Sequence, residues 1–462
     1  MNAADVIAAR LAAAGVKHAF GIPGGEVLTL IDALERAGIR FILTKHENAA
    51  GFMAEGTWHA TGAPGVLVAT VGPGVANAFN VVANAEQDRV PLIVLSGCVD
   101  AADAISYNHQ IFDHGAVFKE VCKASFTATD GAVDVMIDKA LGISLSGRPG
   151  PVHIDLPIRV ADADQPAPRA WRHAASTPTA PAGPGLEQAR EMFGAAQRPV
   201  MMAGLDVLNE PGGAEAVRTF VERHQIPLLT TYKAKGILPE DHPLSLGGHG
   251  LSPKSDKLVL PIFEQADCII AAGYDPIEMR TGWQAPWDPA KVIEFAHAPN
   301  DHDMHHAALS WVCSVTAGLA AIDGPAQPSW SDGTAAKMRD AYWDAFAAQT
   351  EWGPDQAIAE MLAVAPDNTT ITIDSGAHRI LLSQQWQAKH PRAILQSTGL
   401  CTMGCALPLG MGFKNADPAA PVIAFMGDAG LEMTMGELAT LRDLGLPLVV
   451  VVFVDRSLAL IE

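Results

Sequence analysis

The sequence lacks any apolar segment long enough to cross a membrane. Its longest apolar run, Leu448 to Val454, has about a third of the residues that a membrane span needs and is rich in β-branched residues, so it predicts a buried strand. At the start of the chain, Asp5 and Arg10 interrupt what would have to be the apolar core of an export signal, which favours an amphipathic first helix instead. We therefore expect a soluble protein that is not associated with membranes.

Paired cysteines and clustered basic residues are also missing. The six cysteines are scattered without the C-x-x-C pairs of zinc sites, and a chain of 462 residues is long enough to fold without disulfides, so we expect a reducing, cytoplasmic location. The 31 Lys and Arg against 51 Asp and Glu give a net charge of -20, and the basic residues form no stripe. This charge balance predicts that the protein does not bind nucleic acid.

The sequence has short β-branched runs that alternate with longer amphipathic stretches, a pattern that predicts parallel sheets covered by helices. Its length exceeds what one hydrophobic core supports. We expect three doubly wound α/β domains at residues 1–160, 186–322 and 341–462, joined by linkers at 161–185 and 323–340 that are rich in Pro, Ala and small polar residues. The predicted strands are 41–44, 66–71, 92–95, 152–156, 200–202, 228–231, 268–271, 292–295, 371–373, 422–425 and 448–454.

The first and third predicted domains share one pattern, in which a strand, a glycine-containing turn and a helix are followed by a strand that begins with proline. Gly72 precedes Pro91 by 19 residues, and Gly427 precedes Pro447 by 20. The pattern predicts a duplicated fold with one site shared between the two copies. The middle domain is expected to be Rossmann-like. It is not expected to be a dinucleotide-binding module, because no predicted strand is followed by G-x-G-x-x-G with a downstream acid.

Two acids follow consecutive predicted strands near the end of the chain. Asp428 stands in the turn Gly427-Asp428-Ala429-Gly430, and Asp455 ends the next strand 27 residues later. Asp428 alone could be an ordinary helix cap. Two carboxylates at the carboxyl ends of neighbouring strands, beside small residues and a helix start, favour a magnesium-bridged diphosphate.

This arrangement resembles the motif of thiamine diphosphate (ThDP) enzymes, which consists of Gly-Asp-Gly, a helix and a strand, then Asn-Asn. The resemblance implies that Asp428, Asp455 and the carbonyl of Ser457 hold Mg²⁺. The chain departs from the motif at Ala429, which replaces a glycine, and at Val454-Asp455, which replaces Asn-Asn. The diphosphate contacts that the resemblance implies are Gly427, Ala429, Gly430, Gly376, Ala377 and His378, although a lone His at a strand end could also be structural.

Glu47 stands between a predicted strand and a predicted helix, where the helix dipole favours a carboxylate whatever its function. Ala50 occupies the place of the second His of a zinc H-E-x-x-H motif, which excludes that site. The segments GIPGGEVLTLIDAL, KHENAAGFMAEG and TVGPGVANAFNVVANAEQDRVPLIVLSG resemble the acetolactate synthase-like branch of ThDP enzymes in the same order. This resemblance implies that Glu47 bonds the aminopyrimidine ring of the cofactor and activates it. Further cofactor contacts that it implies are Gly24, Gly25, Gly72, Pro73 and Asn77.

The segment STGLCTMGCALPLGMG is similar to the family loop that grips the same pyrimidine. The resemblance implies that Met403 bends the cofactor and that the carbonyl of Cys401 receives the amino hydrogen. Cys401 stands where close relatives have Gly. Met403 could instead serve only to fill the core, since methionine packs into irregular gaps.

The segment SYNHQIFDHGAVFKEVCKASF corresponds to the wall of the reaction chamber in acetolactate synthases. Gln110 coincides with the active-site Gln of that branch. His109 replaces a Phe, and it could relay protons, bond a substrate carboxylate or be a solvated loop residue. In the middle domain, EQADCIIAAGYDPIEMRTGW most resembles catabolic acetolactate synthases, which carry no flavin, so FAD is not expected.

The resemblance implies decarboxylation of a 2-oxo acid, pyruvate first, followed by transfer of the two-carbon unit to a second carbonyl. A decarboxylase or a benzaldehyde lyase-like carboligase acting on aromatic or other 2-oxo acids and aldehydes is the alternative. A catalytically silent subunit that binds a nucleotide or cofactor is the non-enzyme alternative. The resemblance also implies a homodimer or dimer of dimers with sites at subunit interfaces. Relatives usually continue past the position of Glu462, so we expect further residues there, the substrate lid among them.

Overall fold

The computed structural model describes residues 1–170, 179–326, 329–458 and 460–461. Residues 171–178 of the first expected linker and 327–328 of the second lie outside the described residues. The chain divides into two compact units, of which one comprises Met1–Ala175, Ile371–Ser375 and Gln396–Glu462, and the other comprises Ser176–Thr370 and Gly376–Leu395. In the part of the chain that the structure describes, no helix is both long and apolar enough to span a membrane.

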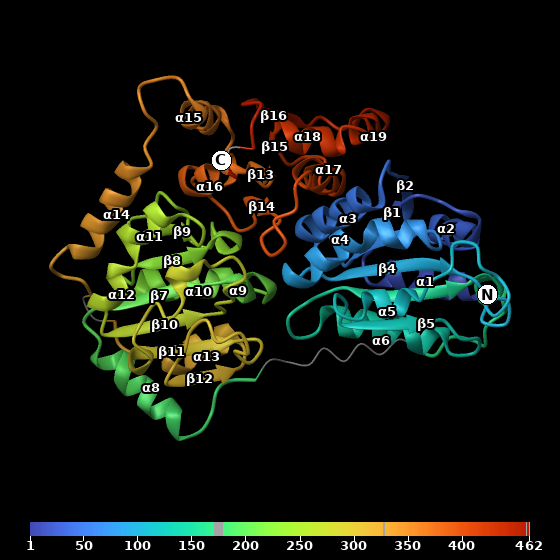
Figure 1. The fold of residues 1–462 in the computed structure, drawn as a ribbon. Coiled ribbons are helices and arrows are strands. Elements are labelled where there is room, and N and C mark those ends of the chain that lie inside the picture. Colours follow the sequence, from blue (N-terminus) through green and yellow to red (C-terminus); the bar gives the residue numbers. More distant parts are fainter. Residues whose placement is uncertain (171–178, 327–328, 459, 462) are drawn as a thin grey trace. The chain divides into compact units, whose positions relative to one another are not determined.

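The first domain is a six-stranded parallel sheet with the strand order β2-β1-β3-β4-β6-β5 (Figure 1). Its elements in chain order are α1 (Ala3–Ala13), β1 (His18–Gly21), η1 (Gly25–Val27), α2 (Leu28–Arg36), β2 (Arg40–Leu43), α3 (Glu47–Thr61), β3 (Gly65–Ala69), α4 (Pro73–Gln87), β4 (Leu92–Cys98), α5 (His114–Phe118), β5 (Ala124–Thr127), α6 (Val133–Leu145), β6 (Val152–Pro157) and α7 (Ile158–Asp162).

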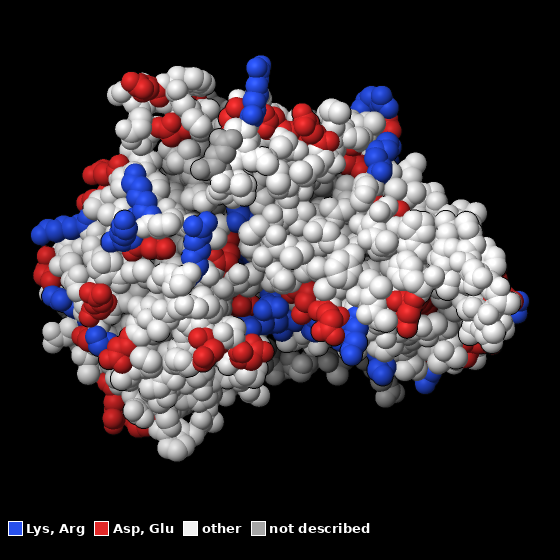
Figure 2. Space-filling model, viewed as in Figure 1, with Lys and Arg blue, Asp and Glu red and all other residues white. Residues whose placement is uncertain are grey.

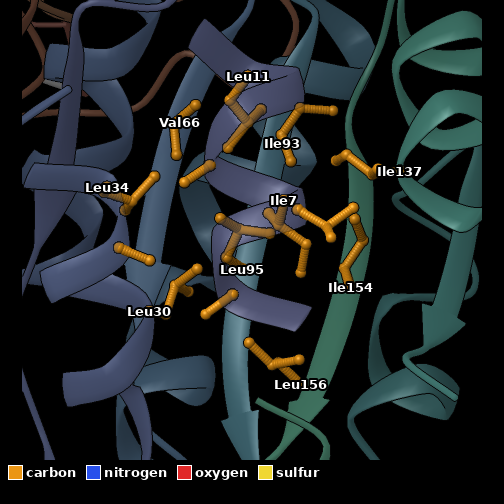
Figure 3. Close-up of a cluster of buried hydrophobic side chains, with 14 of the residues drawn as sticks. Ile7, Leu11, Leu30, Leu34, Val66, Ile93, Leu95, Ile137, Ile154 and Leu156 are labelled. Carbon is orange, nitrogen blue, oxygen red and sulfur yellow. The ribbon is translucent and has the colours of Figure 1, made fainter. Parts of the chain in front are cut away.

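One face of this sheet is covered by α1, α2 and α6. Alternate strand residues point to the same face, so Ile93 and Leu95 of β4 both meet Ile7 of α1 in a continuous apolar cluster (Figure 3). Helices α3 and α4 contact β1, β3 and β4. Because helices pack against it, the sheet can consist of nearly continuous apolar strands, as the burial of all five residues of β3 illustrates.

The central domain is a six-stranded parallel sheet with the order β12-β11-β10-β7-β8-β9. Renumbered within the domain, this is the 3-2-1-4-5-6 order of the Rossmann fold, which confirms the expected architecture. Its elements are α8 (Pro184–Ala195), β7 (Pro199–Ala203), α9 (Leu205–Asn209), α10 (Gly213–His224), β8 (Leu228–Thr231), η2 (Tyr232–Ala234), β9 (Ser245–His249), α11 (Pro253–Val259), α12 (Pro261–Gln265), β10 (Cys268–Ala272), η3 (Thr281–Trp283), η4 (Pro289–Lys291), β11 (Val292–Ala296), β12 (Leu309–Val312) and α13 (Val315–Ile322).

A helix begins inside the span expected as the second linker. Helix α14 (Thr334–Ala345) begins six residues before the expected end of that linker at residue 340. Its Ala335 and Tyr342 are buried in the same apolar cluster as Trp283 and Phe263 of the central domain. Burial of these side chains explains why a segment with weak apolar periodicity folds as a helix.

The last segment contains a four-stranded parallel sheet with the order β14-β13-β15-β16. This is the order β2-β1-β3-β4 of the first domain, strand for strand, as the expected duplication requires. The single crossover helix expected between the two acids is two short helices that meet at Met435 and Gly436. The elements are α15 (Pro354–Val364), β13 (Thr370–Ile373), α16 (Ala377–Gln385), β14 (Ile394–Gln396), α17 (Ala406–Ala416), β15 (Val422–Gly427), α18 (Asp428–Thr434), α19 (Glu437–Leu444) and β16 (Val449–Phe453).

Charged side chains are mixed on the surface drawn in Figure 2. On this face Lys and Arg are interspersed with Asp and Glu, and they form no continuous basic band. The expected lack of a basic stripe thus holds for the face in view.

Candidate functional site

Glu47 is the first residue of α3, and its side chain is only 4% exposed. The Nδ2 of Asn77, on α4, donates a hydrogen bond to Glu47 Oε2 at 3.0 Å. Gly74, also on α4, lies near the other carboxylate oxygen, because a Cβ at this position would be 3.2 Å from Glu47 Oε1. The carboxylate is therefore held in a largely buried position between the first turns of two helices, with Asn77 as a polar partner.

Glu437 fixes the backbone immediately before Glu47. Its Oε1 accepts hydrogen bonds from the backbone N–H groups of Lys45 at 2.8 Å and His46 at 3.1 Å. Glu437 is the first residue of α19 and is 1% exposed. A carboxylate of the third domain thus stabilises the start of the helix that carries Glu47, and the sequence contains no signal for this pairing.

The turns at Gly24 and Gly72 require glycine for different reasons. A Cβ on Gly24 would overlap the Oγ1 of Thr70. Gly72 has a φ of 66°, and a Cβ there would overlap the carbonyl oxygen of Gln110. The next residue, Pro73, begins α4, where its missing N–H costs nothing. Gly25, by contrast, has no atom within 4 Å of a Cβ added there, which leaves open space.

His109 and Gln110 lie in an exposed loop. Gln110 adopts a φ of 59°, which is uncommon outside glycine, and its carbonyl faces Gly72. The His109 ring contacts the edge of Tyr107 with the ring centroids 6.3 Å apart. The loop thus brings Gln110 to the Gly72 turn, whereas contact of His109 with a substrate stays a prediction.

Two carboxylates, which no local sequence pattern indicates, hold the loop before α17 by hydrogen bonds. Asp374, at the end of β13, accepts hydrogen bonds from the N–H groups of Gly404 at 2.9 Å and Cys405 at 2.8 Å. Burial raises the pKa of Asp374, and these backbone hydrogen bonds act in the opposite direction. Asp88 of the first domain accepts from the N–H groups of Thr398 at 3.0 Å and Gly399 at 2.9 Å. The loop that contains Cys401 and Met403 is therefore fixed at both ends.

Within this loop, Cys401 has a φ of 53°, a conformation that favours glycine. Its Sγ donates to the carbonyl of Thr398 at 3.2 Å. Met403 is partly buried and is not part of the buried core. Part of the Met403 side chain is therefore exposed and is not packed against other residues of the chain.

Asp428 and Asp455 lie at the carboxyl ends of adjacent strands. Strands β15 and β16 pair in parallel with Gly427 opposite Phe453. Asp428 Oδ2 accepts a hydrogen bond from the N–H of Arg456 at 3.0 Å, and Asp455 Oδ1 accepts from the N–H of Ser457 at 3.0 Å. The two acidic motifs therefore meet in one place.

The residues beside Asp428 are closely packed. The backbone N–H of Ala429 donates to Asp428 Oδ1 at 2.8 Å. A Cβ on Gly430 would overlap Oδ2 of Asp374, so this position accepts only glycine without rearrangement. Asp374 thus touches both the turn after β15 and the loop before α17.

Gly376, Ala377 and His378 form the start of α16. Gly376 has a φ of 155°, and a Cβ there would lie 2.7 Å from Cε1 of the His378 ring. The imidazole therefore packs on the backbone of the turn, which explains the glycine. Since these residues belong to the second unit, their part in a diphosphate site stays a prediction.

Three models of thiamine pyrophosphate enzyme domains match the sequence. Residues 1–117 match the N-terminal TPP binding domain of thiamine pyrophosphate enzymes, residues 186–322 match their central domain and residues 374–462 match their C-terminal TPP binding domain. The order and spacing of these matches follow the three sheets described above.

Similar proteins include three acetolactate synthases. The chain is 31% identical to a probable acetolactate synthase large subunit of Methanocaldococcus jannaschii, in an alignment that covers 100% of this chain and 81% of the relative. It is 33% identical to the acetolactate synthase isozyme 1 large subunit of Escherichia coli K12, over 97% of this chain and 80% of the relative. It is 28% identical to an acetolactate synthase of Bacillus subtilis, over 98% and 81%. The chain therefore belongs to the acetolactate synthase-like family of thiamine diphosphate-dependent enzymes.

Proposed function

We propose that the protein decarboxylates a 2-oxo acid, pyruvate first, and joins the two-carbon fragment to a second carbonyl, with ThDP and Mg²⁺ as cofactors. When bound, ThDP would supply a nucleophilic ring carbon that adds to the ketone and a cationic ring that accepts the electron pair left behind when CO₂ departs. The meeting of the Asp428 and Asp455 motifs at one sheet edge, in a chain of this family, is the observation that carries the proposal.

The residues at this sheet edge fit a magnesium diphosphate. Asp428, Asp455 and Ser457 offer oxygen atoms, the ligands that Mg²⁺ prefers. Ser457 Oγ is buried and has no hydrogen-bond partner among the described residues. Under the proposal, Asp428, Asp455 and the Ser457 carbonyl would hold the metal, and the backbone from Gly427 to Gly430 would contact the diphosphate.

Glu47 fits the task of holding a proton at a pyrimidine nitrogen. A carboxyl group that is 4% exposed is shielded from water, and Asn77 orients one of its oxygens. Glu437 adds rigidity, because it fixes the two residues before Glu47. Met403 and Cys401 would contact the other side of the ring, in a loop held by Asp374 and Asp88.

The central domain is proposed to carry no flavin. At the switch point of a Rossmann sheet, a dinucleotide places its diphosphate on the turn after the first strand. Here Asp206, in the first turn of the helix α9 that follows this strand, is fully buried and accepts a hydrogen bond from the N–H of His297 at 3.0 Å. A Cβ on Gly204 would overlap the carbonyl oxygen of Gly273, so the two turns also pack closely. A buried carboxylate in this turn disfavours binding of the negatively charged diphosphate of a flavin dinucleotide. We therefore expect the purified protein to show no flavin absorbance.

The substrate is tested by incubating the purified protein with ThDP, Mg²⁺ and a panel of aliphatic and aromatic 2-oxo acids, alone and with acceptor aldehydes, and identifying the products by mass. We expect pyruvate to be consumed with release of CO₂ and formation of a five-carbon hydroxy acid. Products from aromatic 2-oxo acids alone would favour the decarboxylase or carboligase alternative. Consumption of no 2-oxo acid by a protein that binds ThDP would contradict the proposal.

Glu47→Gln is the matched test of the catalytic residue, because it preserves the shape of the side chain and removes its proton. We expect kcat to fall by at least about 100-fold. Glu215→Gln, at an exposed position of α10, is the control and should leave kcat unchanged.

We further propose a homodimer or a dimer of dimers. Several large apolar side chains of the third domain are exposed in the single chain, among them Met433, Met435 and Val449. Such side chains are typical of a surface that a second subunit covers. Light scattering on the purified protein would measure the mass directly.

A further inference from the structure

A buried polar network lies under the Gly72 turn and is not used in the proposed chemistry. His114, the first residue of α5, is 3% exposed, and its Nε2 accepts the N–H of Gly72 at 3.2 Å. Because a backbone N–H can only donate, Nε2 is unprotonated, and the ring proton is on Nδ1. Nδ1 then donates to Oδ1 of Asp155 at 2.7 Å.

Asp155 is held in turn by its neighbours on the sheet. Its Oδ1 also accepts from the hydroxyl of Ser96 at 2.7 Å, and Ser96 Oγ lies 2.6 Å from Nε2 of His153. The other nitrogen of His153 lies 2.7 Å from Ser125 Oγ. Burial alone would raise the pKa of Asp155, but the hydrogen bonds of His114 and His153 outweigh this effect and leave the pKa below its usual value, so the group remains a carboxylate.

These residues could be read as a metal site, since ligand atoms of His114, His153 and Asp155 lie within 4.8 Å of one another. Each ring nitrogen of both histidines, however, already has a hydrogen-bond partner. The geometry therefore points to a closed hydrogen-bond network in place of a metal site.

The Gly72 turn connects this network to two parts of the proposed site. Gly72 is the N-cap of α4, whose first turns carry Gly74 and Asn77, the two neighbours of Glu47. On its other side, Gly72 contacts the backbone carbonyl of Gln110. By accepting the Gly72 N–H, His114 fixes the turn that contacts both the start of α4 and the Gln110 loop.

The Gln110 loop is exposed throughout residues 101–110. A cavity of about 680 Å³ lies beside it, lined by Val71, Ile111, Phe112, His114, Asp155 and Val160 among others. At the far end of the loop, Arg159 pairs with Asp103 at 2.9 Å, but the Arg159 side chain is 69% exposed and such surface pairs contribute little. The hydrogen bond from Gly72 to His114 is therefore the main buried polar anchor of this turn.

We infer that His114, oriented by Asp155, is a positioning residue that fixes the Gly72 turn and thereby seats α4 against Glu47 and holds Gln110 in place. Its effect on turnover rests on the proposed function. Its effect on the Gly72 N–H does not, because this hydrogen bond exists in the protein without substrate.

Two variants of His114 separate its two hydrogen bonds. In His114→Asn, the shorter amide can still reach Asp155 in the place of Nδ1 but not Gly72. In His114→Gln, the longer amide oxygen can accept the Gly72 N–H in the place of Nε2. His306→Asn, at a position where the side chain is 60% exposed, controls for loss of a histidine as such.

Hydrogen exchange of the peptide that contains Gly72, followed by mass spectrometry, measures directly how well the hydrogen bond to His114 protects the Gly72 N–H. We expect exchange at Gly72 to be about 5- to 10-fold faster in His114→Asn and close to wild type in His114→Gln and His306→Asn. Unchanged exchange in His114→Asn would overturn the inference, whether or not the protein turns over any 2-oxo acid.

Kinetics provide the second readout. We expect kcat to fall about 10-fold in His114→Asn, with the dissociation constant of ThDP and the Tm nearly unchanged, and to recover in His114→Gln. Equal losses of kcat and Tm in both variants would show a merely structural histidine and would also overturn the inference. A wild-type protein that turns over no substrate contradicts the proposed function but leaves the exchange result valid.

Discussion

Asp455 is the residue at which this chain departs most from the metal motif that it resembles. Its carboxylate lies beside the Ser457 N–H, one residue from the backbone group that binds Asp428. An amide oxygen at this place can still be a ligand, whereas a methyl group cannot.

We therefore expect Asp455→Asn to bind ThDP in the presence of Mg²⁺ within about 3-fold of wild type, and Asp455→Ala to bind at least about 10-fold more weakly, as measured by titration calorimetry. Asp443→Asn, at an exposed acid that pairs with Arg442, is the control. Wild-type affinity in Asp455→Ala would remove this residue from the site.

Some candidate site residues lie close together because they follow strands that are consecutive in the chain. The sequence predicts this kind of proximity. Asp428 and Asp455 meet because consecutive parallel strands pair, which a pattern of strands and helices predicts. Glu437, by contrast, binds Lys45 across 392 residues of chain. Asp374 and His114 likewise act through tertiary contacts, so no local pattern pointed to them.

At the scale of elements, helices α3 and α17 pack so closely that glycine is required on both. A Cβ on Gly56 would overlap the carbonyl oxygen of Leu409, and a Cβ on Gly412 would overlap that of Met53. Because the obstacles are backbone atoms, they cannot move aside as a side chain would. The first and third domains are thus joined by a backbone contact between helices.

We expect Gly56→Ala to lower the free energy of unfolding by at least about 2 kcal/mol in urea denaturation. Gly142→Ala is the matched control, because Gly142 lies inside α6 and nothing lies within 4 Å of a Cβ added there. It should raise stability by about 0.5–1 kcal/mol. Equal effects of the two substitutions would show that helix packing does not decide the residue at position 56.

Most strands with strong β-branched runs were predicted within one or two residues, as for Leu228–Thr231 and Val292–Ala296, whereas Leu92–Cys98 extends three residues beyond its predicted end. Five strands were missed: His18–Gly21, Ala124–Thr127, Ser245–His249, Leu309–Val312 and Ile394–Gln396. Four of these five lie at a sheet edge, where one side is unpaired and fewer apolar residues are needed. Glycines in His18–Gly21 and Ser245–His249 further weaken the strand signal.

At the scale of the whole molecule, stability should depend on pH through a buried histidine of the central domain. Burial, and then the charge of Lys235, lowers the pKa of His249 from 6.5 to about 3. Between these values the unfolded chain binds a proton at this residue and the folded protein does not. The contribution of His249 is therefore fully present above pH 6.5 and is lost as the pH falls toward 3.

We expect His249→Gln to reduce the dependence of the unfolding free energy on pH by about 1.4 kcal/mol per pH unit at about pH 5. Urea denaturation at several pH values measures this slope, which can be compared even if the variant is less stable overall. His306→Gln, at an exposed site, should leave the slope unchanged. Parallel slopes for wild type and His249→Gln would contradict the assignment.

The first and third domains are two copies of one fold, and we propose that the cofactor site is divided between them. The strand order of the first four strands is the same in both copies, and each copy presents an acid at the carboxyl end of a strand or the start of the next helix, Glu47 in one and Asp428 in the other. Under the proposal, residue type at these few positions, not the shared fold, decides which end of the cofactor each copy would hold.

The most direct test of the account is the thermal stability of the protein with and without ThDP and Mg²⁺. At a ThDP concentration about 100-fold above its dissociation constant, binding stabilises the folded protein by about 2.7 kcal/mol. We predict a Tm higher by several degrees when ThDP and Mg²⁺ are both present, and no such rise in Asp428→Ala. An unchanged Tm in the folded wild-type protein would contradict the account.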